Sequence, residues 1–132
     1  LCSYVWFSAL GFPHMALEFP YKRQSPISKK MTVYRDLEQV WQEIYQLVDN
    51  WKDSDYSLGR NLYFYLPLFM NPKWIISGDE STLITEYNYV KEFNIPLGRD
   101  LDSADAEKLE VFDRIRSEIN NIKIYMSEKN GR

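Results

Sequence analysis

Two long stretches of this chain carry apolar residues at three- and four-residue spacing. Such spacing gathers apolar side chains on one face of an α-helix and leaves polar side chains on the other. The chain is therefore predicted to be mainly α. The apolar stripes are Val33, Leu37, Val40, Trp41, Ile44, Leu47, Val48 and Trp51 in the first stretch, and Leu109, Phe112, Ile115, Ile119, Ile122 and Met126 in the second.

The beginnings of these two helices are expected at Thr32 and Ser103. Both hydroxyls can accept a hydrogen bond from an unpaired backbone N–H in the first helical turn. In the second helix, Glu118 is a charged residue among the apolar ones. It is expected to face water, as are Arg114, Arg116 and Lys123.

A third apolar segment, SLGRNLYFYLPLFMNPKW at residues 57–74, contains Pro67 at its centre. Its apolar residues also follow helical spacing. Proline lacks a backbone N–H and clashes with the preceding helical turn. We therefore expect a helix here that kinks or ends near Leu66.

Residues 74–93 are compatible with two structures. Ser81 can cap a helix that carries Leu83, Ile84, Tyr87, Val90 and Phe93. Many of the same residues are also good strand formers, so a hairpin around residues 74–90 is the alternative. The helix predicts a small bundle of three to four helices with an apolar N-terminal arm, and the hairpin predicts an α+β fold.

Residues 1–17 contain no charged side chain, and a basic segment follows them. We expect a strand or irregular apolar arm that lies on the core. The alternatives are contact with a membrane surface or a remnant of a targeting segment. The chain then divides into an arm at residues 1–30 and a helical domain at residues 31–132.

Charge is distributed unevenly along the 132 residues. Residues 19–35 contain five basic side chains and no acidic one, whereas acidic residues outnumber basic ones by seven in residues 36–132. An acidic body disfavours nucleic-acid binding, which needs clustered Lys and Arg, and suits a basic protein partner. The single cysteine, Cys2, cannot form an intramolecular disulfide, so a cytoplasmic location is expected.

The residue types that usually carry catalysis are sparse. The chain has one histidine, His14, and no glycine-rich phosphate loop. The acidic segment RDLDSADAE contains Asp100, Asp102 and Asp105, but it lacks the glycine turn and the distal Glu of a calcium loop. We therefore predict no catalytic residue, no metal ligand and no cofactor.

Aromatic residues give the stronger functional signal, because they make up 16% of the chain. Tyr63 and Phe64 precede Tyr65 directly, so all three rings cannot face one core from a helix. By the same argument, Tyr87 and Tyr89 cannot both face the core from one helix, and neither can Tyr125 together with the neighbouring Met126. Tyrosine is common at the rim of small cores and is also enriched in binding hot spots.

These observations favour a non-enzymatic interaction protein, such as an inhibitor, an immunity-type protein or a subunit of an assembly. Its partner is expected to be a protein with a basic surface, or a second copy of the chain. The predicted contact residues are Tyr63, Phe64, Tyr87, Tyr89, Asp100, Asp102 and Asp105. The alternatives are a membrane-surface protein that attaches through residues 1–30, and a small-ligand binder or carboxylate enzyme.

Overall fold

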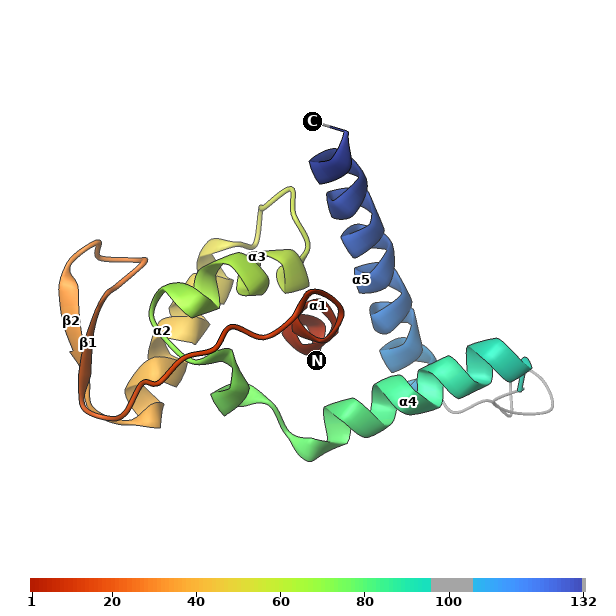
Figure 1. Cartoon of the computed structure of the whole chain (residues 1–132), viewed down its shortest axis with the longest axis horizontal. Coiled ribbons are helices and arrows are strands. Elements are labelled where there is room, and N and C mark those ends of the chain that lie inside the picture. The colour runs from red at the N-terminus through yellow and green to blue at the C-terminus, as the bar shows by residue number, and fades with distance from the viewer. Residues whose placement is uncertain (96–105, 132) are drawn as a thin grey trace.

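The computed structural model describes residues 1–95 and 106–131, and within them the chain is mainly helical with one short antiparallel hairpin (Figure 1). The elements in chain order are α1 (Cys2–Leu10), β1 (Tyr21–Gln24), β2 (Met31–Tyr34), α2 (Leu37–Asn50), α3 (Leu58–Tyr65), the 3₁₀ helices η1 (Leu66–Leu68) and η2 (Pro72–Ile75), α4 (Gly78–Phe93) and α5 (Ala106–Asn130).

The predicted cap at Thr32 is wrong, because Thr32 lies in strand β2 opposite Arg23. Helix α2 begins at Leu37, and the Asp36 carboxylate caps it by accepting a 3.0 Å hydrogen bond from the backbone N–H of Gln39. Residues 31–34 pair with β1 instead of extending the helix. The predicted cap at Ser103 lies outside the described residues.

The alternative hairpin around residues 74–90 is also wrong. This region forms η2 and α4, and the helix begins after Ser77, so Ser81 lies inside it. The only described sheet is the β1–β2 hairpin at residues 21–34. The prediction that Pro67 ends a helix is confirmed, because α3 ends at Tyr65 and the chain tightens into η1.

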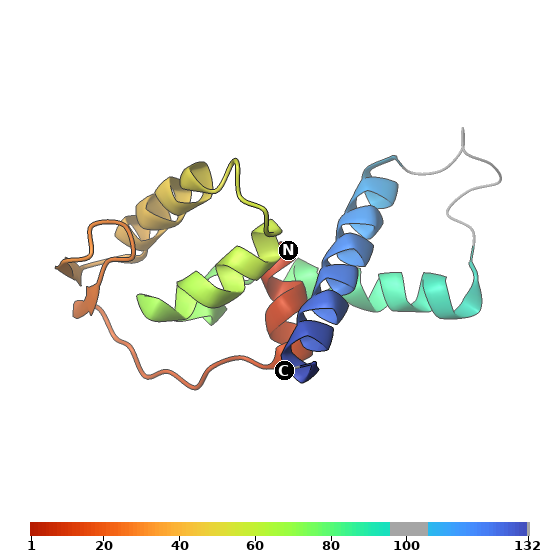
Figure 2. The same cartoon turned by 90° about the horizontal axis from the view of Figure 1, so that it is seen from above.

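The first residues of the chain form helix α1, not the expected strand or irregular arm. Figure 2 shows α1 between α3 and α5, and it contacts both. Its residues Val5, Trp6 and Phe7 are buried. A helix that is apolar on most sides is typically enclosed by other elements, and α1 fits that description.

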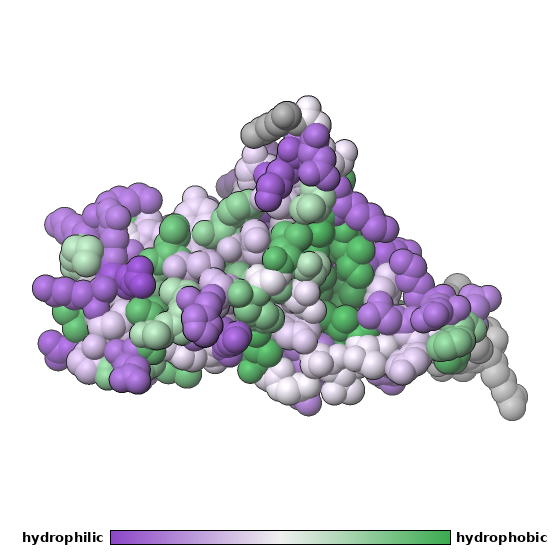
Figure 3. All heavy atoms as spheres, viewed as in Figure 1, coloured by the Kyte–Doolittle hydropathy of each residue, from purple (hydrophilic) through white to green (hydrophobic). Residues whose placement is uncertain are grey.

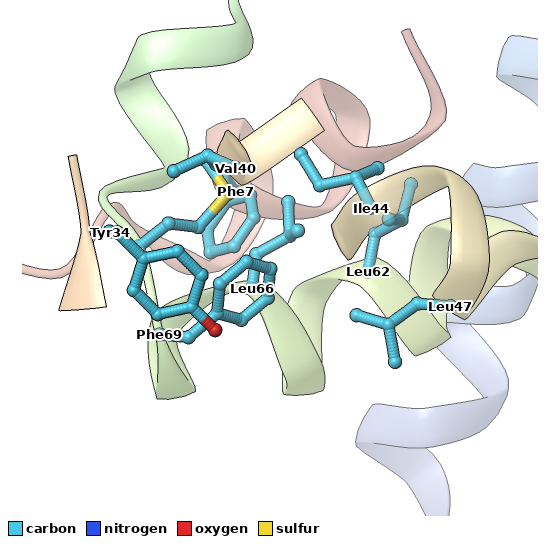
Figure 4. Close-up of a cluster of buried hydrophobic side chains, with 9 residues drawn as sticks. Phe7, Tyr34, Val40, Ile44, Leu47, Leu62, Leu66 and Phe69 are labelled. Atoms are coloured by element: carbon cyan, nitrogen blue, oxygen red, sulfur yellow. The ribbon is translucent and has the colours of Figure 1, made fainter. Parts of the chain in front are cut away.

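Two clusters of buried side chains stabilise the fold, and α1 contributes to both. Figure 4 shows the first cluster, which joins α1, the hairpin, α2 and α3. The second cluster joins α1, α4 and α5. The first contains Phe7, Tyr34, Val40, Ile44, Leu47, Leu62, Leu66, Phe69 and Met70, and the second contains Val5, Trp6, Tyr87, Phe112, Ile115 and Ile122.

The structure does not confirm the predicted small bundle of three to four helices, because the described residues contain five α-helices. Helices α1, α3 and α5 pack together at the centre, whereas the hairpin with α2 and helix α4 extend to opposite sides (Figure 1). Figure 3 shows hydrophobic residues gathered at the centre of this face, over α1 and α5. Among the described helices, none has the length and apolar character needed to cross a membrane.

Candidate functional site

The centre of the molecule is organised around a buried carboxylate, Glu118 of α5. Its side chain accepts a 2.6 Å hydrogen bond from Trp6 Nε1 and a 3.2 Å hydrogen bond from Ser57 Oγ. Glu118 is only 6% exposed. The expectation that it faces water is therefore wrong, because α1 covers this side of α5.

Close approach of α3 to this carboxylate depends on Gly59. A Cβ atom at residue 59 would lie 1.7 Å from Glu118 Oε2 and 2.5 Å from Trp6 Cδ1. Both distances are far below van der Waals contact, so a larger residue would displace the Glu118 carboxylate and the Trp6 ring or shift the helices. Gly59, Trp6 and Glu118 thus fix α1, α3 and α5 against one another.

A groove with a volume of about 400 Å³ lies beside this junction. Its walls come from α1, the chain that follows α1, helix α3 and helix α5. The lining residues are Phe7, Leu10, Gly11, Phe12, Pro13, Tyr63, Phe64, Pro67 and Tyr125. We call this feature the aromatic groove.

The predicted contact residues Tyr63 and Phe64 both line the aromatic groove. Tyr63 is half-buried, with its ring centroid 5.1 Å from that of Phe7. Phe64 remains 43% exposed and contacts Tyr125 edge-on at a centroid distance of 5.5 Å. Tyr63 therefore fixes the wall of the groove, and Phe64 presents an apolar ring to whatever enters it.

Two hydroxyl groups at the aromatic groove have no hydrogen-bond partner among the described residues. They belong to Tyr63 and Tyr125. Burial raises the pKa of Tyr63, so its hydroxyl stays protonated at neutral pH. Both hydroxyls can donate to, or accept from, polar groups of a bound chain.

Two cations flank the rings of the groove. The guanidinium of Arg60 lies 5.2 Å from the centroid of the Tyr125 ring, and Lys73 Nζ lies 5.8 Å from that of Phe12. Arg60 also forms a 3.6 Å ion pair with Glu128. Lys73 therefore places a positive charge beside Phe12, which disfavours a basic residue there, whereas Glu128 balances the charge of Arg60.

The other predicted contact residues do not join the aromatic groove. Tyr87 is buried at 7% exposure and packs edge-on against Phe112. Tyr89 is 56% exposed, stacks on Phe93 and lines a separate hollow along α4. Asp100, Asp102 and Asp105 lie outside the described residues.

Sequence reasoning singled out Tyr125 but missed the contributions of Phe12 and Pro13. Phe12 and Pro13 follow α1 directly and enter the groove only because α1 is a helix packed on α3. No spacing rule in the sequence predicts these placements.

The described residues contain no group of three or more His, Cys, Asp or Glu side chains that could hold a metal ion. Cys2 is half-buried, and burial raises the pKa of its thiol. A thiol with a raised pKa carries little thiolate at neutral pH and is a weak nucleophile.

Comparison with known proteins does not place the chain in a family. No family model matches it, and neither a curated protein nor a solved structure is similar to it at a significant level. Any functional proposal therefore depends on the geometry of this chain alone.

Proposed function

We propose that the chain is an interaction protein and that its aromatic groove binds an apolar segment of a partner protein. The single observation that carries this proposal is the exposed ring of Phe64 in a groove walled by Tyr63, Tyr125 and Phe12. Aromatic grooves of this kind bind extended peptide segments in several recognition domains.

The chemistry of the lining suits a peptide better than a compact polar ligand. Rigid aromatic rings offer a large contact area at a small cost in side-chain entropy. The hydroxyls of Tyr63 and Tyr125 can bond to the backbone of a bound segment, whose carbonyl and N–H groups recur along its length.

The charges at the rim restrict the bound segment further. A segment with lysine or arginine beside Phe12 would lie close to the ammonium group of Lys73. We therefore propose a segment of apolar, aromatic or proline residues without basic ones. If the partner also has a basic surface, its attraction to this chain would come from acidic residues outside the groove, such as Asp100 and Asp102. That attraction would add to the binding of the apolar segment in the groove.

Selection from a random-peptide display library tests this function directly. Purified protein should enrich apolar peptides, and the enriched peptide should bind with a measurable Kd in solution. Phe64→Ser should weaken that Kd by roughly thirtyfold, because a central aromatic hot spot contributes at least about 2 kcal/mol. Tyr45→Ser is the matched control, since Tyr45 is also an exposed ring at 64% but lies on α2.

Either of two results would contradict the proposal. Either the library yields no enriched peptide, or the selected peptide binds the Phe64→Ser and Tyr45→Ser proteins equally well. Denaturant unfolding of both variants shows that any loss of binding does not come from loss of the fold.

A further inference from the structure

A second surface lies on the β1–β2 hairpin, at the end of the molecule away from α5 (Figure 1). The hairpin and its flanks carry five exposed cations: Lys22, Arg23, Lys29, Lys30 and Arg35. No acidic residue occurs between residues 19 and 35. In the described part of the chain, none of the five forms an ion pair.

The outer side of this hairpin is apolar as well as basic. Lys22 pairs across the ladder with Val33, and Gln24 pairs with Met31, so these four side chains share one side of the sheet. Met31 is 64% exposed and Val33 is 39% exposed. We call Lys22, Met31 and Val33, together with the turn residues Lys29 and Lys30, the hairpin face.

The opposite side of the hairpin is held firmly against the core. The Tyr21 hydroxyl donates a 2.7 Å hydrogen bond to the carbonyl oxygen of Phe69, and its ring stacks on Tyr34. Glu43 of α2 accepts hydrogen bonds from the hydroxyls of Tyr34 and Ser25. The hairpin is thus fixed in an orientation that keeps Met31 and Val33 pointing outward.

We propose that the hairpin face docks on the surface of an anionic lipid bilayer, with Met31 and Val33 at the level of the headgroups. Clustered lysines are attracted to anionic headgroups, and exposed apolar side chains gain from contact with the acyl boundary. The charge of the hairpin is complementary to such a surface, whereas the acidic remainder of the chain points the molecule away from it.

The apolar contact comes from the hairpin and not from the centre of helix α1. Val5, Trp6 and Phe7 are buried in the protein core, so they cannot enter a bilayer in this fold. A bilayer also accounts for the hairpin face better than a nucleic acid does. Met31 and Val33 offer neither stacking rings nor phosphate contacts, which single-stranded nucleic acids require.

Vesicle co-sedimentation tests the proposal with the full chain. The protein should bind vesicles of equal parts phosphatidylcholine and phosphatidylserine, and it should not bind phosphatidylcholine alone. Binding should fall when the salt concentration is raised from about 0.1 M to 1 M, because the screening length shortens from about 10 Å to 3 Å.

Two variants separate the contributions to the hairpin face. The triple variant Lys22→Gln, Lys29→Asn and Lys30→Gln should bind roughly a hundredfold more weakly, at about fivefold for each cation. Asparagine is chosen at residue 29 because Lys29 has a φ of 63°, which Asn tolerates. Met31→Ser with Val33→Ser should weaken binding by roughly tenfold while every cation is retained.

A matched control removes three exposed lysines elsewhere: Lys52→Gln, Lys91→Gln and Lys123→Gln. Its binding should stay within about threefold of the parent protein. Equal losses in the control and the hairpin variant would overturn the proposal, as would equal binding to neutral vesicles. The protein could instead bind single-stranded polyuridylate, with a dependence on Lys22, Lys29 and Lys30 but none on Met31 and Val33. That result would overturn the proposal and assign the hairpin face to a nucleic acid.

Discussion

Trp6 and Glu118 are joined by a 2.6 Å hydrogen bond across 112 residues of sequence. This bond connects α1 to α5, and both helices provide walls of the aromatic groove. The position of Phe12 and Tyr125 across the groove therefore depends on a buried polar contact. Buried carboxylates are retained in folded proteins when their hydrogen bonds are satisfied, as they are here.

Replacing Trp6 by Phe keeps an aromatic ring but removes the N–H that donates a hydrogen bond to Glu118. The free energy of unfolding should fall by about 1–3 kcal/mol, which is the cost of an unpaired buried polar group. Denaturant unfolding measures this loss. Trp41→Phe is the control, because Trp41 is half-buried and donates no hydrogen bond to any described residue. A smaller loss for Trp6→Phe than for the control would contradict the role of this bond.

Gly59→Ala should destabilise the protein by about 1–3 kcal/mol, since overpacking forces neighbouring side chains or helices out of place. The added Cβ would meet Glu118 and Trp6 at distances that no packed structure tolerates. Gly78→Ala is the matched control, because no atom lies within 4 Å of a Cβ added there. Thermal unfolding measures the loss of stability in both variants. Equal midpoints for Gly59→Ala and Gly78→Ala would show that α3 can move away from α5.

A fragment of residues 31–132 should lose cooperative unfolding. It lacks α1, and with it Val5, Trp6 and Phe7, which belong to the two buried clusters. Near-ultraviolet circular dichroism during heating reports the loss of fixed aromatic packing. A sharp, cooperative transition in this fragment would show that residues 1–30 are only an appended arm.

Alkaline conditions should weaken the fold in part through Tyr21. Burial raises the pKa of Tyr21 to about 12, from about 10 in an exposed tyrosine. Its contribution is fully present below about pH 10 and is lost toward pH 12, because the unfolded chain releases the proton first. Tyr21→Phe should therefore show a shallower decline in the free energy of unfolding over this range.

The control for this titration is Tyr45→Phe, because Tyr45 is 64% exposed. It should reproduce the pH dependence of the parent protein. Burial and the neighbouring Glu43 raise the pKa of Tyr34 as well, so a residual decline is expected in the Tyr21→Phe protein. Identical profiles for both variants would show that burial does not raise the pKa of Tyr21 in solution.

The sequence predicted the parts of the fold that depend on local pattern. The stripe of α2 was recovered at Val40, Ile44 and Leu47, which are buried. Pro67 ended α3 as expected, because its effect on the backbone is local. The mainly helical class follows from such signals, which act within a few residues.

The remainder depends on contacts between distant segments. Glu118 lies at helical spacing from Ile115 and Ile122, but its charge predicts exposure to water, and the docking of α1 buries it. Strand β2 contains Val33, which fits the helical stripe of α2 equally well, and pairing with β1 decides its conformation. For the site, the surplus of rings at Tyr63 and Phe64 was visible, but Phe12 and Pro13 reach the groove only through the packing of α1 on α3.

Amide chemical-shift mapping with the selected apolar peptide tests the central claim most directly. Titration of the isotope-labelled protein should shift the resonances of Gly11, Phe64 and Tyr125, which surround the aromatic groove. Resonances of Tyr89 on α4 and Met31 on the hairpin should stay unchanged. Shifts confined to α4 or to the hairpin, with Phe64 and Tyr125 unaffected, would contradict the assignment of the groove as the binding site.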